Sequence, residues 1–141
     1  MYKIKIATVG KTKEPWLQDG LEEYTTRLKP FLTIEWILAK NLEKLKQLLK
    51  QEGVYLCLDP NGKLRSSEQF SQFLIEKLQQ GGSRLTLVIG DADGLSPEIR
   101  DNASGLISLS PLTFTHQLTR LVLLEQLYRA IEISRGSSYH K

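Results

Sequence analysis

The chain has 141 residues, of which 40% are hydrophobic and 25% are charged, and its formal net charge is +3. This composition excludes a disordered chain, and no window approaches the roughly 20 apolar residues that a membrane span needs. The length predicts a single domain over residues 1–141 with its own core. The basic balance, with a pI near 9.0, is compatible with a nucleic-acid partner but too small to establish one.

Cys57 is the only cysteine, and it lies in an apolar run where a small buried hydrophobe is expected. A lone thiol forms no internal disulfide and no zinc cluster, so we expect no metal site and a reducing, cytoplasmic location. The first ten residues interleave lysines with apolar residues, which predicts neither a signal peptide nor an anchor.

The first half of the chain alternates apolar strands with amphipathic helices. Residues 2–9 predict a strand, residues 15–28 a helix that opens on proline, and residues 31–37 a second strand. Leucines at helical spacing over residues 42–49 predict a helix whose lysines face solvent. The nearly all-apolar residues 54–58 predict a strand that is buried on both faces.

The second half continues in the same way. Residues 59–62, Asp-Pro-Asn-Gly, predict a turn, and Ser66 or Ser67 predicts the cap of the next helix. Residues 85–89 and 106–109 predict two more strands, with a serine-proline helix start between them. The whole order, β-α-β-α-β-α-β-α-β-α, predicts an α/β fold with a mostly parallel sheet and helices on both faces.

The last predicted helix, from His116 to about residue 135, is apolar around most of its circumference. Such a helix is buried on more than one side, so in a domain of this size we expect a homodimer. Glu125 and Arg129 are spaced to pair on a solvated face. Arg120 lies in the apolar stripe, where an arginine needs a partner such as a carboxylate or a phosphate. Taken alone, His116 is equally well an ordinary helix-start histidine.

Two predicted strands end in loops that are rich in glycine, serine and threonine. Residues 85–89 lead into Gly90, and residues 106–109 lead into the loop at 110–114. Ligands bind outside the carboxyl ends of strands in open α/β sheets, so these loops predict a small-molecule crevice. A mononucleotide-binding enzyme is one interpretation, but the chain lacks the glycine-rich motifs of typical NAD and ATP sites.

The chain ends with Tyr139, His140 and Lys141 after a run of glycine and serine. A frayed terminus is the plain interpretation. A phenol, an imidazole and an ammonium group together also suit contact with a negatively charged polymer and proton transfer.

Five segments of the chain resemble the ribosomal RNA large subunit methyltransferase H family: residues 9–28, 56–70, 88–97, 106–136 and 139–141. The resemblance covers essentially the whole chain. It implies a SPOUT-class homodimer with a deep C-terminal trefoil knot that uses S-adenosylmethionine to methylate N3 of a pseudouridine in large-subunit (23S) ribosomal RNA. Physical reasoning from the sequence predicts no knot, because true knots are nearly absent from protein folds.

Carried over residue by residue, the resemblance implies a donor pocket at the predicted strand ends. Backbone amides and carbonyls would hydrogen-bond the adenine and ribose, and apolar side chains would form the walls. The chain departs from the family at Asp91, where members usually have glycine, and this change affects the backbone angles that the loop allows. The implied donor-binding residues are Leu58, Gly90, Leu109, Ser110, Pro111, Leu112, Thr113 and Phe114.

The implied reaction requires the N3 proton to leave while nitrogen attacks the sulfonium methyl in line. We expect His140 or His116 to assist proton transfer, and Tyr139 to stack on or hydrogen-bond the target base. The tail is expected to complete the site of the other subunit, since SPOUT sites lie near the dimer interface. The expected phosphate contacts are Arg120, Arg129 and Lys141.

Two further functions stay open. One is a SPOUT enzyme that methylates a tRNA ribose oxygen, which methylation mapping would reveal. The other is a non-catalytic RNA-binding dimer, which donor binding would separate from an enzyme. Because a charge of +3 is low for binding naked RNA, we expect a structured ribosomal particle to supply much of the recognition.

Overall fold

The computed structural model describes residues 1–140. Its five strands form one sheet in the order β2-β1-β4-β3-β5, and every pair of neighbours is parallel. This confirms the predicted α/β class and the parallel sheet. The elements are β1 (Tyr2–Val9), α1 (Pro15–Leu28), β2 (Leu32–Ala39), α2 (Leu42–Glu52), β3 (Leu56–Leu64), α3 (Ser67–Gln80), β4 (Arg84–Val88), α4 (Pro97–Asp101), β5 (Gly105–Ser108) and α5 (His116–Ser134).

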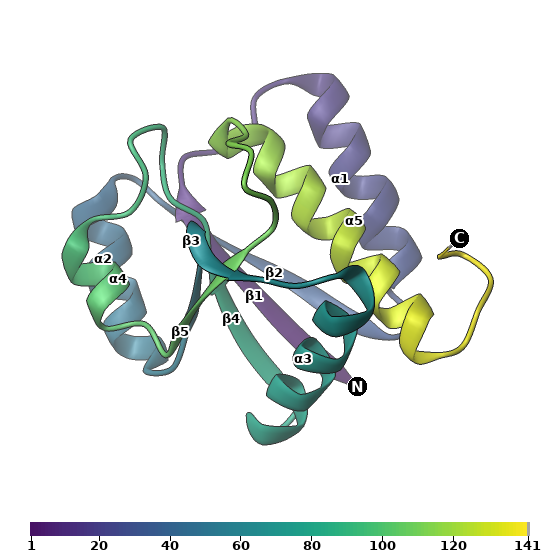
Figure 1. Ribbon diagram of the computed structural model, residues 1–141. Coiled ribbons are helices and arrows are strands. Elements are labelled where there is room, and N and C mark those ends of the chain that lie inside the picture. The colour runs from purple at the N-terminus through teal and green to yellow at the C-terminus, as the bar shows by residue number, and fades with distance from the viewer. Residues whose placement is uncertain (141) are drawn as a thin grey trace.

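Helices cover both faces of the sheet (Figure 1), with α1, α3 and α5 on one side and α2 and α4 on the other. The strands supply both layers by alternation. Ile4 and Ile6 of β1 belong to the core under α5, whereas Ala7 belongs to the core under α2 and α4. Successive side chains of a strand point to opposite faces, so a strand is apolar on both faces only where helices cover both; Lys3 and Lys5 of β1 instead pair with Glu35 and Glu52 on the face opposite Ile4 and Ile6.

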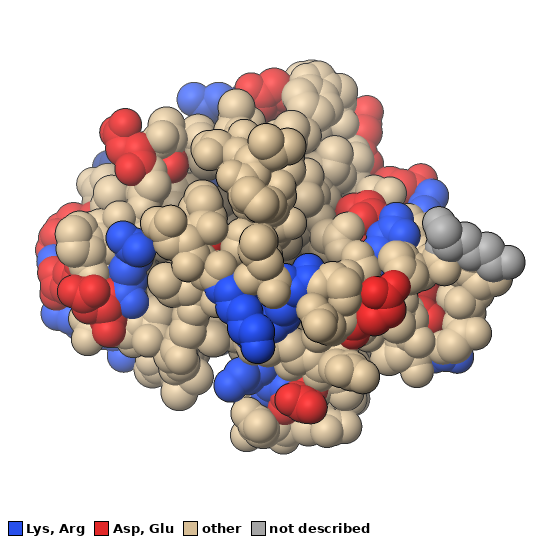
Figure 2. Space-filling view, in the orientation of Figure 1, with Lys and Arg blue, Asp and Glu red and all other residues tan. Residues whose placement is uncertain are grey.

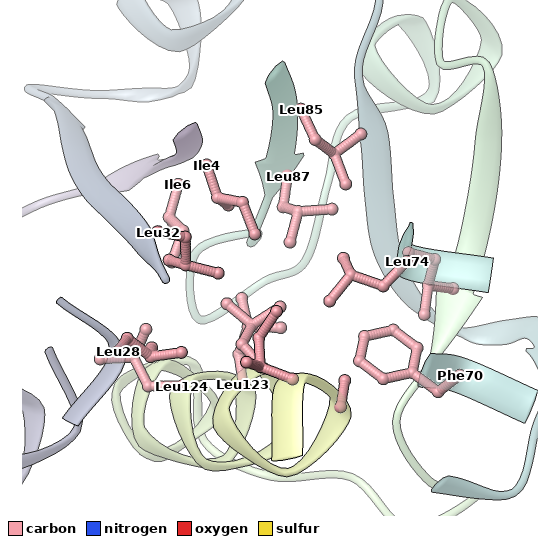
Figure 3. Packing of buried hydrophobic residues seen from close by; sticks show 14 of the residues in the cluster. Ile4, Ile6, Leu28, Leu32, Phe70, Leu74, Leu85, Leu87, Leu123 and Leu124 are labelled. Atoms are coloured by element: carbon pink, nitrogen blue, oxygen red, sulfur yellow. The ribbon is translucent and has the colours of Figure 1, made fainter. Parts of the chain in front are cut away.

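Helix α5 lies at the centre of the larger core (Figure 3). Leu123 and Leu124 are fully buried and face the sheet residues Ile4 and Leu87, with Phe70 of α3 beside them. Burial of each such leucine contributes roughly 1.5–3 kcal/mol. Helix α5, near the C-terminus, therefore packs on β1 at the N-terminus and on β4 in the second half of the chain.

Strand β3 differs from its prediction. It was expected to end at Leu58, but it spans Leu56–Leu64. Both Leu58 and Lys63 pair with Ile107 of β5, so the intervening residues 59–62 leave the ladder and the strand then resumes. A turn-forming composition therefore marks an outward excursion within a strand rather than the end of the strand.

Local chemistry explains this excursion. The backbone N–H of Asn61 donates to Asp59 Oδ1 at 2.8 Å, which is the side-chain turn that aspartate favours. At Gly62 a Cβ atom would come within 2.8 Å of the backbone of Leu106, so only glycine lets the returning chain approach β5 this closely.

The remaining elements lie close to their predicted positions. Strands β2, β4 and β5 begin or end one or two residues away from the predicted bounds, which is within the usual spread of element boundaries. No helix within residues 1–140 combines the length and apolar character required to cross a bilayer.

Candidate active site

A cavity of about 450 Å³ opens at the carboxyl ends of β3, β4 and β5. Leu58 of β3, Gly90 after β4 and Leu109 after β5 all line it. Parallel strands place their carboxyl ends at one edge of the sheet, which brings these distant residues together. The other predicted donor-binding residues also line the cavity, with the exception of Pro111: they are Ser110, Leu112, Thr113 and Phe114.

Several lining residues were not predicted as site residues. Asp59 and Pro60 directly follow the predicted end of the third strand, so the strand-end rule that identified Gly90 could have found them. The start of α5 could not be placed against the cavity from the sequence alone. The additional lining residues are Asp59, Pro60, Ile89, Asp91, Ala92, Gly94, Leu95, Thr115 and Thr119.

Gly90 lies where two backbone segments almost touch. A Cβ atom at this position would come within 2.6 Å of the carbonyl carbon of Gly94. Gly94 N–H donates to the carbonyl oxygen of Asp91 at 2.9 Å, which closes the small loop that forms one wall of the cavity. This wall depends on the absence of a side chain at Gly90.

Asp91 fits this loop without an unusual backbone. Ser83 is the only residue other than glycine with positive φ within residues 1–140, and the positive φ of the loop, +86°, falls on Gly94. Asp91 Oδ1 accepts a hydrogen bond from the backbone N–H of Asp93 at 2.9 Å. The side chain therefore stabilises the turn, and the position does not need the conformational freedom of glycine.

The opposite wall is the loop that precedes α5. Ser110 Oγ accepts from the backbone N–H of Leu112 at 3.0 Å, and Thr115 caps the helix by accepting from Leu118 N–H at 3.1 Å. His116 is the first residue of α5, is half-buried and lines the cavity. These side-chain turns set the direction in which α5 begins and so place the imidazole at the site.

Arg120 lies one turn further along α5 and is fully buried. Its Nη2 donates to the carbonyl oxygens of Val9 and Gly10, both at 2.9 Å, and its Nη1 donates to Thr12 Oγ1 at 2.9 Å. Burial lowers the pKa of the guanidinium. Arg120 thus fastens the start of α5 to the end of β1.

The expectation that Arg120 contacts an RNA phosphate is wrong for this reason. Its guanidinium is buried within the chain, and its partners are backbone carbonyls and a hydroxyl rather than the carboxylate or phosphate expected from the sequence. The prediction that a buried arginine needs a partner was sound. The identity of the partner depends on a contact across 111 positions, which no local pattern reveals.

The C-terminal tail lies against its own chain, on α5 and α3. Tyr139 Oη donates to Glu125 Oε2 at 2.9 Å, and its ring meets that of Tyr128 edge-on with centroids 4.8 Å apart. Burial, and then the bond to Glu125, raise the pKa of the phenol. Arg129 Nη2 donates to the same carboxylate at 2.8 Å, so the predicted Glu125–Arg129 pair forms.

His140 is held by two partners. Arg129 Nη1 donates to its Nδ1 at 2.9 Å, and its Nε2 bonds to Glu68. Arginine has no acceptor, so Nδ1 must be the accepting nitrogen and Nε2 must carry the proton that faces Glu68. The backbone at the start of α3, and then His140, lower the pKa of Glu68.

The two predicted catalytic regions therefore lie apart within one chain. His140 bonds to Arg129, which follows His116 by 13 positions of α5. At 1.5 Å per residue this corresponds to roughly 20 Å. The cavity places His116 beside the residues predicted to bind the methyl donor, whereas Tyr139 and His140 lie toward the other end of the helix. Lys141 lies outside the described residues.

Comparison with known proteins agrees with this architecture. A family model described as "Predicted SPOUT methyltransferase" matches residues 2–140. A ribosomal RNA large subunit methyltransferase H from Protochlamydia amoebophila (strain UWE25) is 53% identical over 141 residues, which cover 100% of both chains. The chain belongs to the ribosomal RNA large subunit methyltransferase H family. The protein of that name from Streptococcus mutans serotype c is 41% identical over 158 residues, which cover 99% of each chain.

A solved structure supports the fold of this methyltransferase H family member. It is described as a probable methylase family protein from Haemophilus influenzae Rd KW20, and it matches 99% of this chain and 70% of its own with a TM-score of 0.52. The identity is 11%, so the likeness shows the fold alone.

The cavity of this family member has an acidic balance. Asp59 and Asp91 line it, together with His116, and no lysine or arginine among residues 1–140 does so. Across residues 1–140, no group of three or more His, Cys, Asp or Glu side chains is arranged to hold a metal ion. A ligand that carries positive charge suits this lining.

Proposed function

We propose that this chain transfers the methyl group of S-adenosylmethionine to N3 of a pseudouridine in large-subunit ribosomal RNA. Full-length similarity to relatives that are named for large-subunit ribosomal RNA methylation supports the reaction and the class of RNA. The observation that carries the proposal is the cavity at the strand ends, which has His116 on its lining.

The cavity fits the methyl donor in size and chemistry. Its volume of about 450 Å³ lies in the range of small-molecule sites. Leu58, Leu112 and Phe114 offer apolar surface for a nucleobase, and the loops on both walls offer backbone amides and carbonyls for the adenine and ribose. When bound, S-adenosylmethionine supplies an electrophilic methyl group on a positively charged sulfur, which suits a lining without lysine or arginine.

His116 is the proposed proton acceptor, and it belongs to the same chain as the cavity. An imide nitrogen attacks a methyl group efficiently only as its proton leaves, and an imidazole is suited to accept a proton near neutral pH. Among the lining residues, His116 is the only histidine. The backbone of α5, fixed by Arg120, holds it beside the donor loops.

We also propose that the active unit is a homodimer in which the tail of one subunit completes the cavity of the other. Within one chain, His140 and the cavity lie at opposite ends of α5. Antiparallel pairing of two α5 helices about a two-fold axis would bring each tail to the partner's cavity. Leu118 and Val122, four positions apart on α5, are half-buried and belong to neither apolar core, which supports such a contact. The C-terminal trefoil knot belongs to this proposal, and a crystal structure traced through residues 88–120 tests it.

The first experiment measures transfer of a labelled methyl group from S-adenosylmethionine to 70S ribosomes, 50S subunits and protein-free RNA that lack the modification. Mass spectrometry maps the product. We expect label on N3 of a pseudouridine and better transfer to the assembled particle. Label on a tRNA ribose oxygen would instead support the related SPOUT activity. Donor binding without transfer to any RNA would contradict catalysis on these substrates.

A second experiment tests the shared site by mixing two impaired variants at a limiting concentration of S-adenosylmethionine, where weakened donor binding lowers turnover. Gly90→Ala damages the cavity, and His140→Ala removes the tail imidazole. If the tail acts in the partner, a mixed dimer contains one intact site, and random mixing raises turnover toward about a quarter of the wild-type value. If the tail acts within its own chain, turnover of the mixture stays at the level of the separate variants. Turnover of the His140→Ala homodimer at the wild-type rate would remove His140 from the mechanism.

A further inference from the structure

The two carboxylates of the donor cavity differ in their partners. Asp59 is compensated, because Arg100 Nε lies 2.9 Å from its Oδ2 and the Asn61 N–H donates to its Oδ1 at 2.8 Å. A carboxylate bound by a guanidinium projects little net charge onto a ligand. Asp59 therefore contributes shape and polarity to the cavity more than charge.

Asp91 has no such compensation within residues 1–140. Its Oδ1 accepts a hydrogen bond from the Asp93 N–H at 2.9 Å, and no lysine, arginine or histidine of the described chain forms an ion pair with it. The residue is half-buried and lines the cavity. Because no lysine or arginine among residues 1–140 lines the cavity, no neighbouring cation of the lining offsets the charge of Asp91 on a bound ligand.

This asymmetry bears on the difference between the methyl donor and its product. S-adenosylmethionine carries a sulfonium, an ammonium and a carboxylate, for a net charge of about +1. S-adenosylhomocysteine, left after methyl transfer, has a neutral thioether in place of the sulfonium. The two molecules share their adenosine and amino-acid parts, so charge at sulfur and one methyl group are the only features that can separate them.

We propose that Asp91 makes the cavity discriminate by charge, so that it binds the sulfonium donor more tightly than the thioether product. This inference rests on the proposed function, because it assumes that the cavity is the donor site. A single carboxylate that shares a partly aqueous cavity with a sulfonium changes affinity by about two- to five-fold. Asp91 would thereby assist release of the product once the positive charge is lost.

The test compares two substitutions in the same loop. Asp91→Asn removes the charge but keeps the side-chain oxygen that accepts from Asp93, so the turn is retained. Asp93→Asn removes an equal charge from an exposed residue that does not line the cavity. Titration calorimetry at pH 7, where the ligands keep their α-ammonium charge, measures binding of S-adenosylmethionine, S-adenosylhomocysteine and sinefungin, in which a cationic amine replaces the sulfonium.

We expect Asp91→Asn to weaken the binding of S-adenosylmethionine and of sinefungin by about two- to five-fold and to leave the binding of S-adenosylhomocysteine nearly unchanged. Asp93→Asn should change the three binding affinities equally or not at all. Equal weakening of the three ligands by Asp91→Asn, an unchanged donor-to-product ratio, or the same change in Asp93→Asn would overturn the inference. If the wild-type chain binds none of the ligands, the proposed donor site fails instead.

Discussion

Gly90 shows how a single residue can determine the shape of the cavity that we propose binds the methyl donor. A methyl group in Gly90→Ala would overlap the backbone of Gly94 at 2.6 Å, and a backbone cannot relieve that overlap by rotating. We expect S-adenosylmethionine binding to weaken by about tenfold or more, with a loss of about 1–3 kcal/mol in stability. Calorimetry and urea unfolding measure the two effects.

Gly105→Ala is the matched control for this change. It lies in β5, and its new Cβ would meet only the flexible Leu56 Cδ2 at 3.3 Å. Donor binding should therefore stay close to wild type. If both alanine variants bind the donor equally well, Gly90 does not shape the site as the structure indicates.

Arg120 links stability to the geometry of the site. In Arg120→Met the carbonyl oxygens of Val9 and Gly10 lose their buried donor, and we expect the free energy of unfolding to fall by about 2–4 kcal/mol. Arg27 is the partly exposed comparison: it pairs with Glu23, with side chains 41% and 58% accessible, and its guanidinium lies 5.0 Å and 5.7 Å from the ring centroids of Tyr24 and Tyr128. Arg27→Met should lower the free energy of unfolding in urea by about 1 kcal/mol or less. Equal losses in the two variants would mean that the Arg120 hydrogen bonds add nothing.

Helix α5 and the tail that follows it form the element on which the proposed shared site depends. The pKa of Tyr139 is raised by burial and by its bond to Glu125, so the tail contact is fully present below the ordinary tyrosine pKa of about 10 and weakens as pH rises above it. Absorbance titration should show a late-ionising phenol that disappears in Tyr139→Phe. An unchanged titration curve in that variant would contradict the docked position of the tail.

Sequence patterns predicted most helices and strands because each of them carries a local sequence signal, such as a capping residue at the start of a helix. Ser66 caps α3 through its bond from the Gln69 N–H at 3.1 Å, and Thr115 and Pro15 mark the starts of α5 and α1 in the same local way. Strand β3 was mispredicted beyond Leu58 because its second half is held by pairing with β5. Pairing with a distant strand leaves no local signal.

For the whole molecule, the alternation of elements predicted the class of fold and the edge of the sheet that carries the cavity. It could not predict the strand order, because that order depends on which distant strands pair. The same limit applies to the catalytic groups. His116 and His140 can be selected from the sequence as groups suited to proton transfer, but the sequence does not show that about 20 Å of helix separates them within one chain. Their joint action remains a prediction about the dimer.

The position of β1 between β2 and β4 also has a consequence for how the protein is made. Ile4 and Ile6 are among the first residues synthesised, yet they are covered by Leu123 and Leu124, which are among the last. Such distant contacts form slowly and only after the intervening chain exists. A nascent chain therefore has this face of its sheet only partly covered, by α1 and α3, until α5 is made, and the exposed apolar surface favours aggregation during that interval.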